Sequence, residues 1–294
     1  MSWRTVIITC RCKLDLKLGY MVVRSEDTKR ILLDEVSVII VENNAVAITG
    51  CLLNELAKRK IKLIFCDEKH NPSSELVSLY GSHDCAARIK SQINWGKELK
   101  DEIWTLIVWE KIHKQAEHLE LLGYHESAEK LHGYLREMEF CDKTNREGHA
   151  AKVYFNALFG VTFSRNNSNA TNAALNYGYS LILSAVNREI VACGYLTQLG
   201  LFHDNMFNEF NLSCDLMEPF RIVVDRFVFK RKFNIFESEQ KHEMCKIFEQ
   251  VFDVDGNKQY LCNAIKLYVR SVFDALNNSD TTLLRFYKFI DEDV

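Results

Sequence analysis

The amino-acid sequence predicts an α+β protein, in which a small β-rich N-terminal domain precedes a large α-helical C-terminal domain. Short β-branched runs alternate with turn-forming residues over positions 1–80, whereas from Ala86 onwards apolar residues recur every three or four positions. Only one proline, Pro219, interrupts this second region. Because 294 residues are more than one small core usually organises, we predict one domain over residues 1–85 and a second over residues 86–294.

The N-terminal region predicts several short elements. The runs 36–41 and 45–49 flank Asn43-Asn44, a pair typical of a tight β-hairpin turn. Leucines at helical spacing between Gly50 and Lys60 predict a short helix. The other expected elements are strands over 5–9, 61–66 and 76–80, a turn at 72–74 and a linker near 81–90.

The C-terminal region has the pattern of a helical bundle. Apolar residues such as Ile103 and Ile107 fall on one helical face, and similar spacings recur towards the end of the chain. The acidic segment 253–257 does not fit a calcium loop, because its glycine is misplaced and Ala264 stands where the bidentate glutamate belongs. We therefore expect a turn at this segment.

The composition narrows the class of protein. No run approaches the ~18 apolar residues of a membrane-spanning helix, and the first residues do not resemble a signal peptide, so we expect a cytoplasmic protein with no membrane partner. The ten cysteines contain no CxxC pair, which favours reduced thiols over a zinc site or disulfides. The net charge of −3 means that any nucleic-acid contact needs local positive charge or a partner protein.

A carboxylate stands at the head of an otherwise apolar helical face. Within the segment 146–155, Glu147 shares that face with Ala150, Tyr154 and Leu158. If the face is buried, the carboxylate needs a metal or another cation as its partner. At a solvated helix start, the helix dipole alone accounts for an acidic residue. This segment by itself leaves both interpretations open.

Two later segments carry further candidate ligands. His203 ends the segment Gly200-Leu-Phe-His, although a single histidine in such a place is more often a hydrogen-bonded core residue than a ligand. Asp215 and Glu218 are three residues apart, so both carboxylates lie on one side of a helical turn. Arg221 follows after three more residues and can pair with Glu218 or bind a phosphate.

Four segments of the helical region together resemble the universal CRISPR adaptation integrase family. They are Glu-Gly-x-Ala-Ala-Lys-x-Tyr-Phe (147–155), Ala-Leu-Asn-Tyr-Gly-Tyr (174–179), Gly-x-x-His (200–203) and Asp-Leu-Met-Glu-Pro-Phe-Arg (215–221). Their order and approximate spacing match the family across the helical region, and the β-rich region fits the family's layout. The run Asn-Glu-Phe-Asn at 208–211 and the glutamate at 218 look most like type II systems.

The resemblance implies a metal-dependent DNA integrase and endonuclease of spacer acquisition. In that reaction the 3′-hydroxyl of a captured DNA fragment attacks a phosphodiester of the repeat array, a transesterification that needs no nucleotide cofactor. At the matching positions, Glu147, His203 and Glu218 would be catalytic ligands of Mg²⁺ or Mn²⁺. Asp215 and Arg221 would support these ligands.

The resemblance also implies partners. They are double-stranded DNA from the captured fragment and the repeat array, a second copy in a homodimer, a small companion adaptation protein that completes a heterohexamer, and in type II systems the effector nuclease and a ring-shaped DNA-end-binding protein. The β-rich domain would serve dimerisation or partner docking. The residues that we expect to contact DNA are Arg165, Arg221, Arg226, Lys230, Arg231 and Lys232. For 230–232 a solvated helix end is an equally good interpretation.

Three other functions are alternatives to this one. An HD-type metal phosphohydrolase built on His203-Asp204 needs His149 and Asp225 as further ligands, and leaves the two matched carboxylate segments unexplained. A catalytically inactive helical DNA-binding scaffold has no need of the intact set of three ligands. A self-mobilising relative that inserts transposon ends shares the metal centre, and the sequence alone does not separate it from the adaptation integrase.

Overall fold

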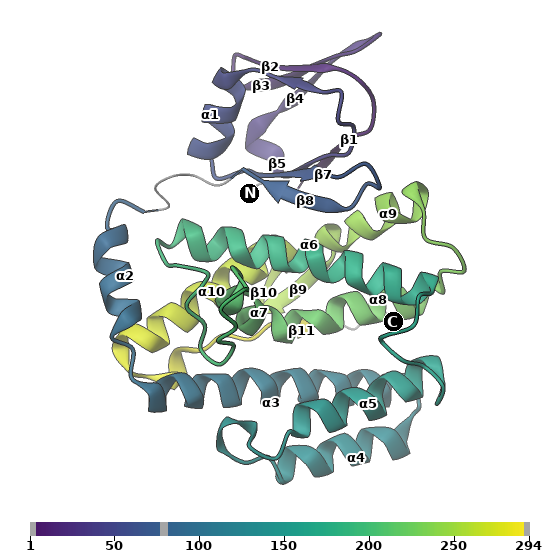
Figure 1. Cartoon of the computed structure of the whole chain (residues 1–294), viewed down its shortest axis with the longest axis vertical. Coiled ribbons are helices and arrows are strands. Elements are labelled where there is room, and N and C mark those ends of the chain that lie inside the picture. Colours follow the sequence, from purple (N-terminus) through teal and green to yellow (C-terminus); the bar gives the residue numbers. More distant parts are fainter. Residues whose placement is uncertain (1–3, 77–81, 291–294) are drawn as a thin grey trace.

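The computed structural model describes residues 4–76 and 82–290 and confirms the α+β class. Strands dominate the N-terminal region, and helices dominate the remainder (Figure 1). The elements of the N-terminal region are β1 (Arg4–Ile8), β2 (Lys13–Lys17), β3 (Tyr20–Arg24), β4 (Thr28–Leu32), η1 (Leu33–Glu35), β5 (Val36–Val41), β6 (Ala47–Ile48), α1 (Gly50–Lys58), β7 (Lys62–Cys66) and β8 (Pro72–Glu75).

The strands form two four-stranded sheets. One has the order β1-β5-β7-β8, with β1, β5 and β7 parallel and β8 antiparallel at the edge. The other has the order β4-β3-β2-β6. An apolar core formed by both sheets and α1 includes Leu14, Met21, Ile39, Leu52 and Leu63. The predicted helix after Gly50 and the predicted strand over 61–66 are confirmed.

The predicted hairpin at Asn43-Asn44 is wrong. β5 pairs in parallel with β1 and β7, whereas the next strand, β6, joins the other sheet beside β2. Every residue of β5 is buried, because one face of the strand contacts the β-rich core and the other face contacts the helices. A strand that is buried on both faces is typical of a central parallel strand and not of a hairpin arm.

Two further expectations for this region are wrong. Residues 72–74, predicted as a turn, begin the edge strand β8, where Pro72 is tolerated because an edge strand does not need every ladder hydrogen bond. The predicted linker over 81–90 contains the start of α2 (Cys85–Ile93). Of the predicted strand over 76–80, only residue 76 falls within the described residues. The boundary at 85/86 stays a prediction.

The helical region is built around two long helices, α3 and α6. Its other helices pack beside them, and α6 lies directly under the β-rich region (Figure 1). Its elements after α2 are α3 (Lys97–Leu121), α4 (His125–Arg136), η2 (Phe140–Asp142), α5 (Arg146–Phe159), α6 (Ala170–Ala192), α7 (Asn211–Met217), η3 (Glu218–Phe220), α8 (Arg221–Arg231), α9 (Ser238–Met244), η4 (Cys245–Glu249), β9 (Val251–Val254), β10 (Asn257–Tyr260), α10 (Leu261–Asn278), η5 (Thr281–Leu283) and β11 (Lys288–Phe289).

The sequence predicts an α-helical region, but this region also contains strands. β9 and β10 form a hairpin, and β11 pairs with the other edge of β9. Asp255 and Gly256 make the connecting turn with positive φ angles of 53° and 77°, the backbone that a two-residue hairpin requires. The expected turn at 253–257 is therefore confirmed.

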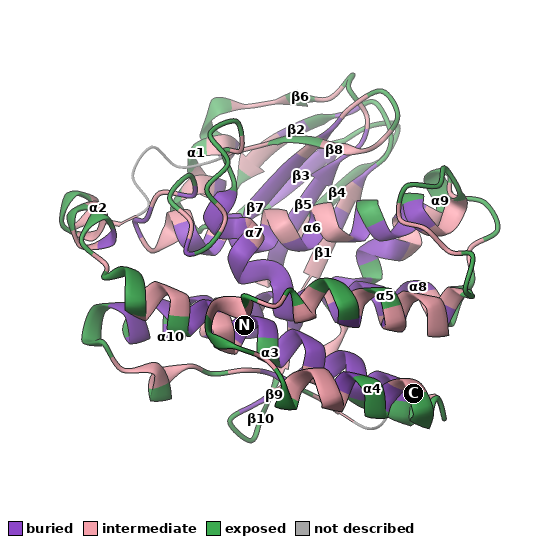
Figure 2. Cartoon of the chain, turned by 60° about the horizontal axis from the view of Figure 1, so that its bottom comes forward, coloured by how far each residue is buried: buried purple, intermediate pink, exposed green. Residues whose placement is uncertain are grey.

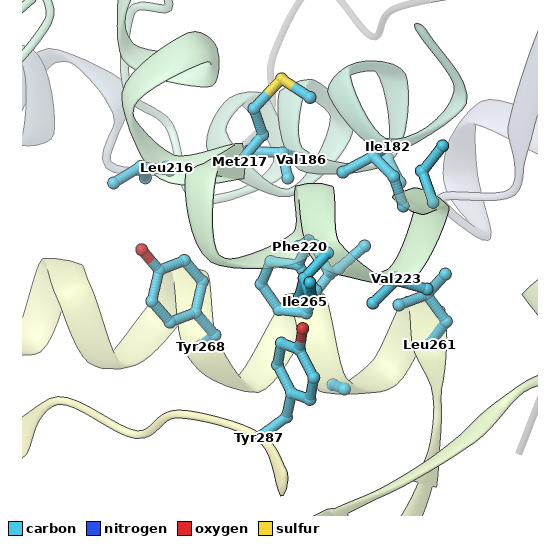
Figure 3. Packing of buried hydrophobic residues seen from close by; sticks show 14 of the residues in the cluster. Ile182, Val186, Leu216, Met217, Phe220, Val223, Leu261, Ile265, Tyr268 and Tyr287 are labelled. Atoms are coloured by element: carbon cyan, nitrogen blue, oxygen red, sulfur yellow. The ribbon is translucent and has the colours of Figure 1, made fainter. Parts of the chain in front are cut away.

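The short helix η3 is anchored in the main apolar core. Its Phe220 is fully buried between α6, α8 and α10 and stacks on Tyr287 (Figure 3). The Tyr287 hydroxyl donates a hydrogen bond of 2.8 Å to the Pro219 carbonyl. These contacts fix the backbone that carries Glu218.

The β-rich region and the helices share this core. Val38, Ile40, Ile64 and Cys66, from β5 and β7, belong to the same apolar cluster as the helical residues. Figure 2 shows these central strands in the buried class, whereas the exposed residues gather on loops and outer helix faces. Glu75 adds polar links, because it pairs with the buried Lys62 and accepts a 2.8 Å hydrogen bond from Ser184 of α6.

Two expectations from composition are met in part. All ten cysteines are free thiols, although only four of them are buried. No helix within the described residues has the length and apolar character needed to cross a bilayer.

Gly178 allows α6 to lie close to α8. A Cβ atom at this position would overlap the Val224 side chain and approach Met244 Cε to 2.7 Å. The glycine of the Ala-Leu-Asn-Tyr-Gly-Tyr motif therefore sets the distance between these two helices.

We expect Gly178→Ala to lower the free energy of unfolding by roughly 1–3 kcal/mol, because overpacking a buried contact forces side chains and backbone to shift. Gly133→Ala is the matched control: its Cβ would meet only an Arg136 nitrogen at 3.9 Å, so the better helix former stabilises α4 by about 0.5–1 kcal/mol. Urea unfolding measures both. Equal stability of the two variants would contradict the packing argument.

Candidate active site

A cavity of about 310 Å³ opens among the helices that carry the candidate ligands. It brings Glu147, His203 and Glu218 together, although they come from three separate segments of the chain. Acidic, basic and aromatic side chains share its wall. The lining residues are Lys111, Gln115, Glu147, Ala151, Phe155, Arg165, Tyr179, His203, Glu218, Arg221 and Asp225.

The two glutamates meet at one ammonium group. Lys111 Nζ lies 2.5 Å from Glu147 Oε1 and 2.5 Å from Glu218 Oε2. Lys111 comes from the middle of α3, where its side chain is only 8% exposed. Arg221 Nε adds a second contact to Glu218, at 2.8 Å. Each carboxylate therefore has a cationic partner within the protein.

These contacts decide the charge state of Glu218. Burial acts to raise the pKa of its carboxyl group, but Lys111 and Arg221 outweigh burial and hold that pKa at about 2. Burial likewise acts to lower the pKa of Lys111, and the two carboxylates raise it above its usual range. Glu218 is thus ionised, beside the charged Lys111 ammonium group and the Arg221 guanidinium group.

His203 is oriented by a buried carboxylate. Asp215, which is fully buried, accepts a hydrogen bond of 2.5 Å from His203 Nδ1. It also accepts backbone N–H bonds from Leu201 (2.6 Å), Phe202 (3.1 Å) and His203 (3.2 Å). Because an ionised carboxylate only accepts hydrogen bonds, Nδ1 must donate, which leaves Nε2 with its lone pair. The hydrogen bond to Asp215 raises the pKa of His203.

Gly200 makes this arrangement possible. A Cβ atom there would overlap the His203 carbonyl oxygen and lie 2.8 Å from Asp215 Oδ2. The loop can wrap around the Asp215 carboxylate only because residue 200 has no side chain. This explains the glycine of the Gly-x-x-His motif.

Two guanidinium groups and Tyr179 also line the cavity. Arg165 donates hydrogen bonds of 2.6 Å to Asn172 and to Asn176, and both Arg165 and Arg221 lie over the Tyr179 ring, at 5.3 and 4.8 Å. The two asparagines of the motif region thus position an arginine. Stacking fixes the planes of both guanidinium groups, a useful property for binding phosphate.

Asp225 is a buried carboxyl group that is only partly ionised at neutral pH. Its burial raises the pKa of this side chain to about 7, against the opposing effect of a hydrogen bond that the Tyr179 hydroxyl donates. Asp225 lines the same cavity as the three candidate ligands. A carboxyl group of this kind is common at functional sites.

The donor set fits a divalent cation in its chemistry. Two carboxylates and an imidazole nitrogen are ligands that Mg²⁺ and Mn²⁺ accept, and the His203–Asp215 hydrogen bond is the usual support for a histidine ligand. No group of three or more His, Cys, Asp or Glu side chains in residues 4–76 and 82–290 is already drawn together into a metal cage. In this arrangement, the Lys111 ammonium stands between the carboxylates.

The sequence of this chain matches a known protein family over most of its length. The family model described as "CRISPR associated protein Cas1" matches residues 5–242. The chain belongs to this Cas1 family. It is therefore a CRISPR adaptation protein, as the four sequence motifs predicted.

Two Cas1 relatives show the extent of the similarity. The CRISPR-associated endonuclease Cas1 of Neisseria meningitidis serogroup C (strain 8013) is 37% identical over 226 residues, which cover 76% of this chain and 74% of that protein. The CRISPR-associated endonuclease Cas1 1 of Francisella tularensis subsp. novicida (strain U112) is 27% identical over 242 residues, which cover 74% and 75%.

Solved structures confirm the fold. A casposase bound to its integration product has a TM-score of 0.74 at 16% identity, covering 96% of this chain and 92% of that one. A CAS1 protein from Thermotoga maritima has a TM-score of 0.72 at 19% identity, covering 95% and 98%. A Cas6-RT-Cas1–Cas2 complex has a TM-score of 0.72 at 16% identity, covering 98% of this chain and 36% of that one.

The six predicted DNA contacts fall in different places on this Cas1 protein. Arg165 and Arg221 line the active-site cavity. Arg226, Lys230 and Arg231 line a second cavity on another face of α8. Lys232 is the exposed residue that ends α8, with a positive φ of 52°, and it lines neither cavity.

The structure does not assemble the HD-type site. His149 is exposed on α5 and packs beside the Tyr134 ring, at 6.0 Å between centroids, and it is not among the residues that line the cavity. Asp204 is also exposed and is likewise absent from this cavity wall. Two of the four residues needed for that alternative thus lie away from Asp225.

Lys111, Gln115 and Tyr179 line this cavity, but they were not predicted from the sequence as site residues. A signal for Lys111 was present, because it continues the apolar face of Ile103 and Ile107 at four-residue intervals. A single lysine on such a face needs a buried anionic partner. Which anion it meets depends on helix packing, which the spacing does not reveal.

We expect Lys111→Met to lower the free energy of unfolding by about 3 kcal/mol or more, because it leaves Glu218 buried without its main counter-charge. Lys130→Met is the matched control: Lys130 forms an exposed pair with Glu126 at 2.8 Å, an interaction worth under about 1 kcal/mol. In Lys111→Met/Glu218→Gln, stability should partly return. Urea unfolding of all three variants provides the measurement, and equal losses for Lys111→Met and Lys130→Met would refute the buried-ion argument.

Proposed function

We propose that this Cas1 protein is a metal-dependent DNA integrase and endonuclease of spacer acquisition, acting at the cavity around Glu147, His203 and Glu218. The observation that carries the proposal is the convergence of these three side chains with two stacked arginines in one cavity. Relatives named as Cas1 endonucleases, and a casposase structure with its integration product, support it.

The proposed reaction is a transesterification. The 3′-hydroxyl of a captured DNA fragment loses its proton and attacks a phosphorus atom of the repeat array. A new phosphodiester bond forms, the old P–O bond breaks, and the departing 3′-oxygen takes up a proton. One phosphodiester replaces another, so the reaction needs no nucleotide cofactor.

Glu147, Glu218 and Nε2 of His203 would hold the divalent ion, Mg²⁺ or Mn²⁺. The ion would stabilise charge on the non-bridging phosphate oxygens. Asp215 keeps the His203 ring in the tautomer that can donate its lone pair. The two glutamates contact Lys111, and Glu218 also contacts Arg221, so two cationic side chains offset their charge before the ion binds.

Arg165 and Arg221 would bind the scissile phosphate. Each guanidinium group has five N–H donors, and Arg165 uses two of its nitrogens on asparagine side chains while Arg221 uses Nε on Glu218. The remaining donors are available to phosphate oxygens in the bidentate geometry that arginine prefers. Holding the phosphate in line with the attacking hydroxyl is the main contribution of such groups.

The proposed partners are those that the reaction requires or that similar proteins show. Double-stranded DNA supplies both reactants, which are the captured fragment and the repeat array. A Cas2-like companion protein is supported by the similar Cas6-RT-Cas1–Cas2 complex. We further propose a Cas1 homodimer, a heterohexamer with the companion, and cooperation with the type II effector nuclease and the DNA-end-binding ring.

Strand transfer of a labelled duplex with free 3′-hydroxyl ends into a supercoiled plasmid that carries a leader and repeat tests this proposal. With Mn²⁺ and the companion protein, we expect products from the wild-type chain and none from 3′-dideoxy ends. Glu147→Gln and Glu218→Gln should reduce transfer by at least about 100-fold, because each removes a metal ligand. Asp215→Asn should reduce it by roughly 10–100-fold.

Asp204→Asn is the matched control for these substitutions. It also neutralises a carboxylate, next to His203, but Asp204 has no role in the proposed reaction and an essential one in an HD-type phosphohydrolase. Its transfer activity should stay at the wild-type level. Loss of transfer in Asp204→Asn together with full activity in Glu147→Gln would reverse the assignment.

A further inference from the structure

A second cavity, of about 500 Å³, lies on another face of α8 and is strongly basic. Five of its lining residues are lysine or arginine, and Glu249 is the one acidic residue among the lining residues. They come from segments that are far apart in sequence: α8, η4, the β9–β10 hairpin and the end of the chain. The lining residues are Arg226, Phe227, Lys230, Arg231, Lys246, Glu249, Gln250, Val251, Phe252, Lys258, Phe289 and Ile290. We call this cavity the basic groove.

Three lysines of the basic groove have no acidic partner. Lys230, Lys246 and Lys258 are exposed, and none forms an ion pair with another residue in the described part of the chain. Mutual repulsion of such cations disfavours their gathering unless an anion joins them. In a chain whose net charge is −3, this concentration of unpaired positive charge stands out.

The two arginines are fixed on aromatic rings. Arg226 lies over the Phe289 ring at 3.8 Å, and Arg231 lies over Phe227 at 5.0 Å while it pairs with Glu243 at 2.6 Å. Aromatic stacking holds a guanidinium plane in place and leaves its edge donors directed outward. The groove thus combines positioned arginines with flexible lysines.

We propose that the basic groove binds the phosphodiester backbone of DNA, at a site separate from the active-site cavity. This inference rests on the proposed DNA-integrase function. Phosphate contacts from lysine and arginine supply most sequence-independent DNA affinity. Exposed, unpaired lysines drawn from three segments of the chain suit a chain of phosphates better than a single small anion, which needs convergent donors.

The position of the groove on α8 relates it to the active-site cavity. Arg221 and Asp225 face the active-site cavity, whereas Arg226 and Lys230, one turn apart, line the basic groove. The single helix α8 therefore carries residues of both cavities. DNA held in the groove would be placed at a fixed offset from the phosphate that reacts.

Equilibrium binding of the full-length chain to labelled duplex DNA tests the groove across a series of salt concentrations. The triple variant Lys230→Gln/Lys246→Gln/Lys258→Gln should bind about 10–100-fold more weakly at low salt. The slope of log affinity against log salt should fall by roughly two to three, because each lost phosphate contact removes about 0.9.

Two variants control for effects on folding and on total charge. Glu249→Gln removes the acidic residue from the groove wall and should strengthen binding, a change that damage to the fold does not produce. Lys130→Gln removes an exposed charge from α4, outside the groove, and should leave the salt slope within about 0.3 of the wild-type value. Thermal unfolding of each variant checks that the fold is intact.

The outcomes separate this inference from the proposed function. If the triple variant and Lys130→Gln bind DNA alike while the wild-type chain still performs strand transfer, the groove proposal fails and the integrase proposal stands. If the triple variant keeps its DNA affinity but loses affinity for the companion protein, the groove is a protein-docking surface and our proposal is overturned. If the wild-type chain performs no transfer, the integrase proposal fails, whatever the groove binds.

Discussion

The ammonium group of Lys111 links the two glutamates on which the active site depends. α5 carries Glu147 and η3 carries Glu218, and both carboxylates contact the same ammonium group. Two carboxylates that share one cationic partner repel each other in a protein interior when both are ionised. Lys111 and Arg221 offset this repulsion in the absence of any added ion. The proposed divalent ion would have to displace the Lys111 ammonium group from its place between the carboxylates.

Backbone geometry supports this site as much as charge does. Gly200 lets a loop close over the Asp215 carboxylate, and Gly178 lets α6 approach α8, which carries Arg221. Phe220 and Tyr287 hold the helical turn of Glu218 in the apolar core. Gly178, Gly200 and Phe220 are uncharged motif residues that thus help to place charged ones. Asn172 and Asn176 act in the same way through Arg165.

The sequence was sufficient to predict the α+β class and the candidate ligands Glu147, His203 and Glu218, which share one cavity, because family motifs and helical spacing are local signals. Lys111 was missed since its partners are distant in sequence. The hairpin prediction at Asn43-Asn44 failed because a local turn signal says nothing about which sheet the next strand joins. The β9–β10 hairpin had a clear signal in Asp255-Gly256, which the surrounding helical pattern obscured. Lys246 and Lys258 reach the basic groove only through tertiary packing.

The shared core of the two regions limits how this protein can be divided. β5 and β7 supply Val38, Ile40, Ile64 and Cys66 to the apolar cluster that also contains the helices. A fragment that starts at residue 86 would expose the apolar surface of α6 that these side chains cover, and would leave the Glu75 partners on that helix without their acceptor. Such a fragment would be prone to aggregation. Substitutions in the β-rich strands can therefore disturb the helices that carry the candidate site without altering any residue that lines its cavity.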